Sequence, residues 1–259
     1  MAAFYEHDGT GYLATGLTRG PWDPGAQHAG PPAALLGREF DLLPEAEDFQ
    51  VCRVTFEIMR SIPIGPVEVA ARIVRPGRRV QLLEGELRVG GEVLMMARGW
   101  RLRTAPVDLP AEAVAIPPGP PLPSEPGPLN FFPTNSDEGY HTAMEIRFVS
   151  GAFNEVGPAT AWLRMRHPLV DDEPPSPLQR VLIAADVGNG ISAAVDFRRF
   201  VFVNVDLTVQ LERLPEGEWV CVDAVTLPRP RGNATAESVL SDERGRLGRA
   251  LQTLLVSER

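Results

Sequence analysis

The sequence predicts an α+β protein made of two copies of one unit, in which an apolar helix is covered by a curved antiparallel sheet. Two stretches have helical spacing and few polar residues, residues 31–40 and 177–187. Short alternating strands accompany each helix, without the strand–helix alternation that a parallel sheet requires. The second half of the chain can also be laid on the first in one continuous register, which indicates an internal repeat.

The composition is that of a soluble globular protein and restricts the kinds of partner. The chain has 259 residues, 44% of them hydrophobic and 23% charged, which is enough for one large or two small domains. A net charge of −9 argues against nucleic acid as a partner. We find no signal peptide and no apolar run of about 20 residues, so we expect no membrane partner and a cytoplasmic location. Cys52 and Cys221 lie in apolar runs and are expected to be small buried residues of a reducing compartment.

In the first half, one helix is followed by four strands. Two prolines fit the first turn of the helix at residues 31–40, which has almost no polar residue before Arg38 and should be enclosed by other elements. The pair Gly90-Gly91 between two alternating stretches predicts a hairpin. We predict a four-stranded antiparallel meander with strands at residues 51–60, 67–74, 80–89 and 93–102.

Between the halves, the sequence changes to a proline-rich segment. Ten prolines fall between residues 104 and 135, and this density excludes a central strand or a long helix. We interpret the segment as an extended linker on the surface, with Phe131 and Phe132 as apolar anchors near its end. The predicted organisation is a first unit at residues 1–104, a linker at 105–135 and a second unit at 136–259.

The second half contains a helix with an unusual polar residue. Apolar residues recur at helical spacing over residues 178–185, Ser176 can cap the start, and Gly188 and Gly190 are expected to end the helix. Asp186 lies near the end of this apolar helix, where a buried carboxylate is costly unless a partner pairs with it or a reaction uses it. Strands are predicted at residues 144–149, 161–166, 200–211, 219–227, 234–240 and 247–256.

The pattern of the second half repeats that of the first. Residues 54–60 match residues 207–213, and the turn at residues 75–78 matches the turn at 229–232. An apolar helix wrapped by a curved antiparallel sheet is the hot-dog fold, so the sequence predicts an α+β double hot dog. Two such sheets can join edge to edge, which removes strand edges that each would expose alone.

Three stretches of this pattern resemble a known family. They are the loop and helix start at residues 28–36 (HAGPPAALL), the strand at 202–209 (FVNVDLTV) and the last strand at 248–256 (GRALQTLLV). With these stretches, most of the chain outside the linker resembles the TesB-like acyl-CoA thioesterases, also called acyl-CoA thioesterase II, of the thioesterase-like superfamily. The resemblance implies hydrolysis of an acyl-CoA to a free acid and CoA, without a metal or an organic cofactor.

The resemblance also implies the catalytic residues. In that family an Asp on the second helix, a Thr or similar polar residue on the next strand and a Gln on the last strand hold the attacking water. These positions fall on Asp186, Asn204 and Gln252. Asn204 departs from Thr, but its amide can still donate and accept hydrogen bonds. Asp186 is the one member of the three that can take a proton near neutral pH, so we expect it to be the general base.

The repeat provides an independent check on this assignment. The first-half counterparts of Asn204 and Gln252 are Val51 and Gly99, and the first helix has no acid before Glu39. Polar groups in one copy and not in the other indicate one active site for each pair of units.

Two residues before the first helix are candidates for substrate binding. The start of a helix offers backbone N–H groups to a developing oxyanion, and Gly30 would let a substrate approach the backbone closely. His28 supports a rival function, because hot-dog dehydratases combine a His near the start of one helix with an acid from the partner helix, and His28 with Asp186 could form such a pair. Hydratases of this fold carry an Asp followed closely by Asn and His, but no histidine follows Asp186 through Arg199.

Other classes of function have weaker support. His7, His141 and His167 are scattered and form no metal set, and the Gly-Xaa-Ser-Xaa-Gly motif of serine hydrolases is absent. A non-catalytic acyl-CoA binding protein stays open, because the residue pattern does not separate a slow enzyme from a binder. Sheet edges and the apolar character of the chain lead us to expect a homodimer or a higher homo-oligomer.

Overall fold

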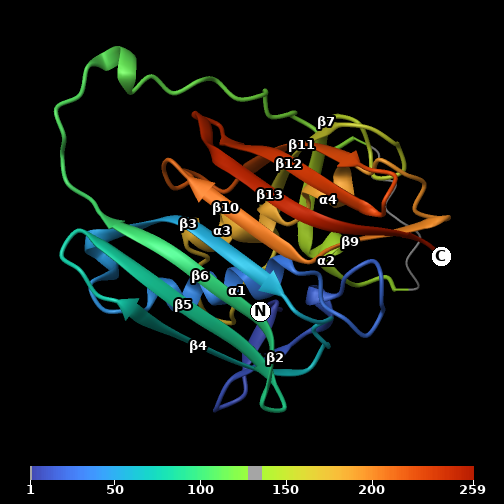
Figure 1. Cartoon of the computed structure of the whole chain (residues 1–259), viewed down its shortest axis with the longest axis horizontal. Coiled ribbons are helices and arrows are strands. Elements are labelled where there is room, and N and C mark those ends of the chain that lie inside the picture. The colour runs from blue at the N-terminus through green and yellow to red at the C-terminus, as the bar shows by residue number, and fades with distance from the viewer. Residues whose placement is uncertain (1, 128–135) are drawn as a thin grey trace.

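The computed structural model describes residues 2–127 and 136–259. Within these residues the strands form one continuous antiparallel sheet, with the order β1-β2-β4-β5-β6-β3-β10-β13-β12-β11-β8-β7 and with β9 paired to β13. The sheet curves around two helices, α1 and α3, which lie behind it in Figure 1. The predicted α+β double hot dog is thereby confirmed.

The first half of the sheet follows the predicted strands but not their predicted order. Its strands are β1 (Tyr5–His7), β2 (Tyr12–Ala14), β3 (Phe49–Ile58), β4 (Pro66–Arg75), β5 (Val80–Val89) and β6 (Glu92–Arg103). The hairpin between β5 and β6 is confirmed, with Gly90 and Gly91 both at positive φ. The predicted meander is wrong in one connection, because β3 pairs with β6 and not with β4. The chain crosses over between β3 and β4. One edge of β3 pairs with β6, and its other edge is free to pair with the second half.

The second half repeats this arrangement. Its strands are β7 (Met144–Ser150), β8 (Ala159–Met165), β9 (Phe200–Asn204), β10 (Asp206–Leu211), β11 (Val220–Pro228), β12 (Asn233–Asp242) and β13 (Gly245–Glu258). The strand predicted at residues 200–211 is interrupted at Val205, so that β9 and β10 are separate. The interruption lies directly after Asn204, a predicted site residue.

The two halves meet where β3 and β10 pair in antiparallel fashion. Thr55 lies opposite Thr208, and their hydroxyl oxygens are 3.1 Å apart. The cross-strand pairs confirm the predicted repeat register, in which Gly99 is the counterpart of Gln252. Leu83 of β5 lies opposite Gly99 in the first half. At the corresponding place in the second half, Ala236 of β12 lies opposite Gln252.

The two long helices lie side by side on the inner side of the curved sheet. They are α1 (Gly30–Asp41) and α3 (Pro177–Ala185), and they approach closely at Gly37, where an added Cβ would contact Leu182. The first helix is buried from Gly30 to Arg38, as predicted. The start of α3 also follows the prediction, because the hydroxyl oxygen of Ser176 accepts a hydrogen bond from the N–H of Gln179.

The end of α3 differs from the prediction. We expect Gly188 and Gly190 to end the helix, but α3 ends at Ala185 with Asp186 as its C-terminal cap, and a second short helix, α4 (Gly188–Ile191), follows. An added Cβ at Gly188 would lie 2.6 Å from the hydroxyl oxygen of Ser238. Glycine at this position is therefore required by the close packing of α4 on the sheet and not by a helix stop.

The segment after β6 runs along the outside of the molecule, and its first part swings away from the sheet at the upper left of Figure 1. Its later part is fixed to the second half, where the indole N–H of Trp162 donates to the carbonyl oxygen of Pro121 at 3.1 Å. The predicted anchors Phe131 and Phe132 lie outside the described residues. Short 3-10 turns lie at Gly16–Thr18, Ala46–Asp48 and Ala111–Ala113.

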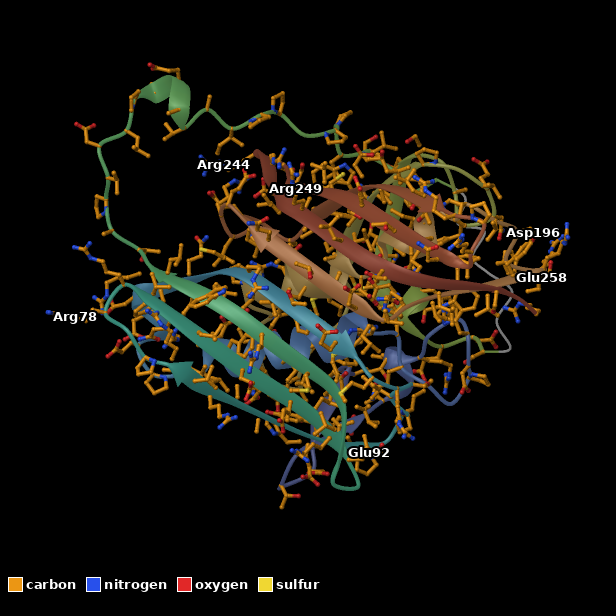
Figure 2. The ribbon with its side chains drawn as sticks, viewed as in Figure 1. Arg78, Glu92, Asp196, Arg244, Arg249 and Glu258 are labelled. Carbon is orange, nitrogen blue, oxygen red and sulfur yellow. The ribbon has the colours of Figure 1, made fainter. Side chains whose placement is uncertain are left out.

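The space between the helices and the sheet is filled by apolar side chains, while many charged side chains lie in turns and at strand ends. Figure 2 shows Arg78, Glu92 and Arg244 at the periphery of the molecule. Cys52 is half-buried, Cys221 is buried, and both are free thiols. A cluster of polar side chains buried next to the end of α3 therefore stands out from its surroundings.

Candidate active site

A cavity of about 320 Å³ opens beside the end of α3, and Asp186 is part of its wall. Because Asp186 caps a helix that lies inside the sheet, the residue is only 3% exposed. The loop before α1, the end of β3, the short helix α2 (Tyr140–Ala143), α4 and the end of β9 complete the wall. The apolar part of the lining includes Trp22, Ile58, Ile62, Phe153, Val187 and Val203. Both the size and the mixed lining are typical of small-molecule sites.

One oxygen of the Asp186 carboxyl is held by two side-chain amides. The Nδ2 group of Asn204 donates to Oδ1 at 2.9 Å, and the Nε2 group of Gln252 donates to the same atom at 3.1 Å. Gln252 is fixed at both ends, because its Nε2 also donates to the main-chain oxygen of Asp186 and its Oε1 accepts from the N–H of Asn189 at 3.0 Å. The carboxyl therefore has a defined orientation in the cavity wall.

The other oxygen faces a histidine. Oδ2 of Asp186 lies 3.1 Å from Nδ1 of His28, and the backbone N–H of Gly30 donates to the same ring nitrogen at 3.1 Å. The His28 ring is stacked on the ring of Tyr140, with centroids 3.9 Å apart and an angle of 4° between the planes. The hydroxyl of Tyr140 donates to the carbonyl oxygen of Ile183 in the last turn of α3 at 2.9 Å. The C-terminal end of one helix is thus connected to the start of the other through this ring pair.

Burial sets the protonation of this pair. Desolvation raises the pKa of Asp186 to about 7, although the hydrogen bonds from Asn204, from Gln252 and from the backbone N–H of Gly30 act in the opposite direction. Desolvation lowers the pKa of His28 to about 3. Near neutral pH the histidine is therefore uncharged, and Asp186 exchanges a proton in the range where a general base is most effective.

The first half of the molecule has no corresponding polar cluster at the matched positions. Gly99 occupies the place of Gln252, and the ring of Phe40 fills the space above it, with Cε2 only 3.1 Å from a Cβ added at Gly99. The repeat therefore builds a packed apolar layer in one copy and a polar cluster in the other.

The structure brings all five predicted site residues together, but it gives them different surroundings. Asp186, Asn204 and His28 line the cavity, while Gln252 lies behind the carboxyl. Gly30 lies beside the Asp–His pair, and its N–H donates to the histidine ring and also favours the ionised carboxyl of Asp186.

Two residues of this cluster are not predicted from the sequence. Tyr140 lies in a short helix after the proline-rich segment, and no residue pattern in the sequence marks it as part of a site. Asn189 follows Asp186 by three residues, but only the packing of α4 brings its N–H to Gln252.

Residues 2–127 and 136–259 contain no group of three or more His, Cys, Asp or Glu side chains arranged to hold a metal ion. In the same part of the chain, no helix combines the length and the apolar character that crossing a bilayer requires.

Both halves of the chain match sequence families. Residues 18–102 match the acyl-CoA thioesterase N-terminal domain, and residues 113–256 match the acyl-CoA thioesterase C-terminal domain. A comparison with curated proteins gives no match.

Solved structures with the same fold include three bacterial proteins of low sequence identity. A conserved protein of unknown function with hot dog fold from Alicyclobacillus acidocaldarius has a TM-score of 0.69 and 17% identity, with 98% of this chain and 95% of that chain covered. The tesB protein of Mycobacterium avium subs paratuberculosis has a TM-score of 0.64 and 16% identity, with 98% and 96% covered. The acyl-CoA thioesterase II TesB2 of Mycobacterium marinum has a TM-score of 0.63 and 15% identity, with 89% and 88% covered.

Proposed function

The chain belongs to the acyl-CoA thioesterase family and is a thioester hydrolase, and we propose that it hydrolyses acyl-CoA with a water molecule activated by Asp186. The observation that carries the proposal is the buried Asp186 carboxyl in the cavity wall, held by two amides and with a pKa raised to about 7. A carboxyl with these properties can accept a proton from water near neutral pH. The apolar lining of the cavity fits an acyl chain.

The reaction follows from this arrangement in two steps. Asp186 takes a proton from the water, and the water oxygen forms a bond to the thioester carbon. The C–S bond then breaks, and the proton passes from Asp186 to the departing sulfur, which gives a free acid and the thiol of CoA. Asp186 returns to its ionised form, so the cycle needs no other proton carrier.

The two amides have different parts in this proposal. Asn204 lines the cavity and can contact the water while it donates to Asp186. Gln252 has both ends of its amide bound to protein atoms, so its contacts support a role in holding the carboxyl. Direct contact of Gln252 with the water, as the family resemblance implies, stays a prediction.

Replacement of the base tests the proposal. Asp186→Asn keeps the size of the side chain but removes the basic oxygen, so kcat for thiol release should fall by about 10²–10⁴-fold. Binding of acyl-CoA should change little, because the lost interaction acts mainly in the transition state. In the wild type, kcat/KM should rise with pH through about 7, as Asp186 ionises. The measurement is thiol release from a panel of acyl-CoAs with EDTA present.

Asp108→Asn is the matched control, because Asp108 is exposed on the segment between the halves. This variant should keep wild-type turnover. Full activity of Asp186→Asn would contradict the assignment of the base. Tight binding of an acyl-CoA by the wild type without thiol release from any member of the panel would instead identify a binding protein.

A second function is favoured by one contact. His28 and Asp186 form the His–acid pair that a hot-dog dehydratase would use, with 3.1 Å between Nδ1 and Oδ2. Such an enzyme would remove water from a 3-hydroxyacyl thioester and leave the thioester intact. Formation of an enoyl thioester without release of thiol would support this alternative.

We further propose that the protein acts in the cytoplasm as a homodimer or a higher homo-oligomer. Two free thiols and no disulfide in the described residues fit a reducing compartment. Large apolar side chains are exposed on the segment between the halves, including Val107 at 70%, and such exposure is typical of contact surfaces.

A further inference from the structure

We propose that Tyr140 is a positioning residue for the proposed hydrolysis, because its ring holds His28 in place and its hydroxyl binds the end of the helix that carries Asp186. The inference rests on the proposed thioesterase function. It extends the site to α2, a helix of four residues that follows the proline-rich segment.

A single backbone turn fixes both His28 and Tyr140. The N–H of His28 donates to the carbonyl oxygen of Thr18 at 2.7 Å, and the N–H of Tyr140 donates to that of the next residue, Arg19, at 3.0 Å. The guanidinium of Arg19 also holds the chain that leads into α2, because it donates to the hydroxyl oxygen of Ser136 at 2.7 Å. Two residues far apart in the sequence are therefore attached to neighbouring positions of the same turn.

The ring of Tyr140 covers one face of the His28 ring. The centroids are 3.9 Å apart with 4° between the planes, and Tyr140 is only 2% exposed. A ring whose rotamer is locked by packing holds its neighbour in a defined orientation. The stack therefore keeps the His28 ring beside Asp186, with Nδ1 at 3.1 Å from Oδ2.

The hydroxyl of Tyr140 binds the helix end that carries the base. The last four carbonyl groups of an α-helix have no N–H partner within the helix. Ile183 carries one of these groups in α3, and its carbonyl oxygen accepts from the Tyr140 hydroxyl at 2.9 Å. Burial and the charge of Asp186 both raise the pKa of Tyr140, so the hydroxyl keeps its proton and remains a donor. Asp186 follows Ile183 by three residues, and the bond therefore fixes the place from which the carboxyl projects.

The ring also keeps water from the carboxyl. Tyr140 lines the cavity beside Asp186, and its removal would leave a space with polar walls, of the kind that water enters. Hydration favours the ionised carboxyl, so the pKa of Asp186 should then fall from about 7 toward its usual 3.8. His28, Asp23 and Arg60 also line the cavity and stay unchanged in the variants below, whereas β9, β13 and α4 contribute uncharged amides.

Two substitutions separate the ring from the hydroxyl. Tyr140→Phe keeps the stacked ring but removes the bond to α3, so kcat for thiol release should fall by about 3–10-fold, the usual effect of one lost hydrogen bond. Tyr140→Ala removes both contacts, and kcat should fall by about 10²-fold, as expected when reacting groups shift by about 1 Å. KM should change less than kcat, because Tyr140 acts on the catalytic groups.

The pH profile distinguishes positioning from a loss of stability alone. The midpoint of kcat/KM against pH should stay near 7 in the wild type and in Tyr140→Phe, and it should move to lower pH by about one unit or more in Tyr140→Ala. Tyr12→Phe is the matched control, because this buried hydroxyl is bonded to Arg38 and Glu39 on another part of α1. The control should keep the wild-type kcat and midpoint.

The ring pair can also be measured without turnover. In a stack, the ring current of Tyr140 moves the NMR signals of the His28 ring protons upfield, and the signals of His28 are those that disappear in His28→Gln. The upfield shift should persist in Tyr140→Phe and be lost in Tyr140→Ala. Unchanged His28 signals in Tyr140→Ala would overturn the proposal.

The kinetic outcomes separate a failure of this proposal from a failure of the proposed function. Wild-type kcat in Tyr140→Ala, or a lower kcat with the midpoint still near 7, would overturn the positioning role. If Tyr140→Ala does not fold, wild-type kcat in Tyr140→Phe would overturn it instead. Absence of thiol release from the wild type with every acyl-CoA would show that the proposed function itself is wrong, and the positioning role with it.

Discussion

At the scale of single residues, the two oxygens of Asp186 have separate partners. Oδ1 accepts hydrogen bonds from two amides, and Oδ2 faces the ring of His28. The amides favour the ionised carboxyl, but the loss of solvent outweighs them, and the pKa rises to about 7. The same burial acts on His28 in the opposite direction, so both members of the pair favour their uncharged forms.

These two shifts have opposite effects on stability. The raised pKa of Asp186 means that its contribution is fully present below its usual value of 3.8 and is lost as the pH rises through about 7. The lowered pKa of His28 means that its contribution is present above its usual value of 6.5 and is lost as the pH falls toward 3. Between about pH 4 and 6.5 the two slopes therefore cancel in the wild type.

Single substitutions should reveal each slope. In His28→Gln, the free energy of unfolding should fall with rising pH over that range, by up to about 1.4 kcal/mol per pH unit, because only the contribution of Asp186 remains. In Asp186→Asn the free energy of unfolding should rise with pH, because only the contribution of His28 remains. Urea unfolding of both variants and the wild type at several pH values measures the slopes. Slopes of the same sign in the two variants would contradict the assignment.

At the scale of elements, the site depends on how two helix ends meet. The cap of α3 supplies Asp186, and the residues just before and at the start of α1 supply His28 and Gly30. The helices can approach closely because Gly37 of α1 faces Leu182 of α3, with Leu178 also nearby. The distance between the two helices therefore sets the distance between the two halves of the site.

Gly37→Val should disturb this approach. The new side chain would contact Leu182, which is itself fully buried and cannot move without displacing its neighbours. We expect a loss of about 1–3 kcal/mol in the free energy of unfolding, as for other overpacked cores. Urea unfolding measures the loss. Gly127→Ala is the control, because nothing lies within 4 Å of its added Cβ, and equal stabilities of the two variants would show that the helices are not in close contact.

In the whole molecule, the pairing of β3 with β10 joins the sheets of the two repeats into one continuous sheet. The pairing joins the two sheets within one chain, and the central strands are no longer edges. The two repeats then differ at this position, because the ring of Phe40 lies above Gly99 in the first copy, whereas Gln252 occupies the matched position in the second. We therefore expect one active site for each chain.

Association of chains must then use other surfaces, because the internal pairing already joins the two hot-dog units. We expect a dimer or a larger assembly in sedimentation velocity at micromolar concentration, with dissociation on dilution. The exposed apolar side chains on the segment between the halves provide contact area for such an assembly. A single monomeric species over the whole concentration range would contradict this prediction.

The local pattern of residues was enough to predict most elements. Apolar spacing and prolines placed α1, Ser176 placed the start of α3, and Gly90-Gly91 placed a hairpin, because these signals act over a few neighbouring residues. Comparison of the two halves also assigned Gly99 as the counterpart of Gln252, which the strand register confirms. The pairing of β3 with β6 was missed, because strand order depends on contacts between residues far apart in the chain.

The two-copy α+β fold and the polar residues that distinguish the second copy can therefore be predicted from the order of the residues along the chain. Only the tertiary structure decided how those residues contact one another: which oxygen of Asp186 faces His28, that the N–H of Gly30 is bound to the ring, and that Tyr140 stacks on it. The physical reason is that a hydrogen bond or a ring contact depends on differences of a few tenths of an ångström. Such distances are set by the packing of the helices against the curved sheet, and the spacing of residues along the chain does not contain them.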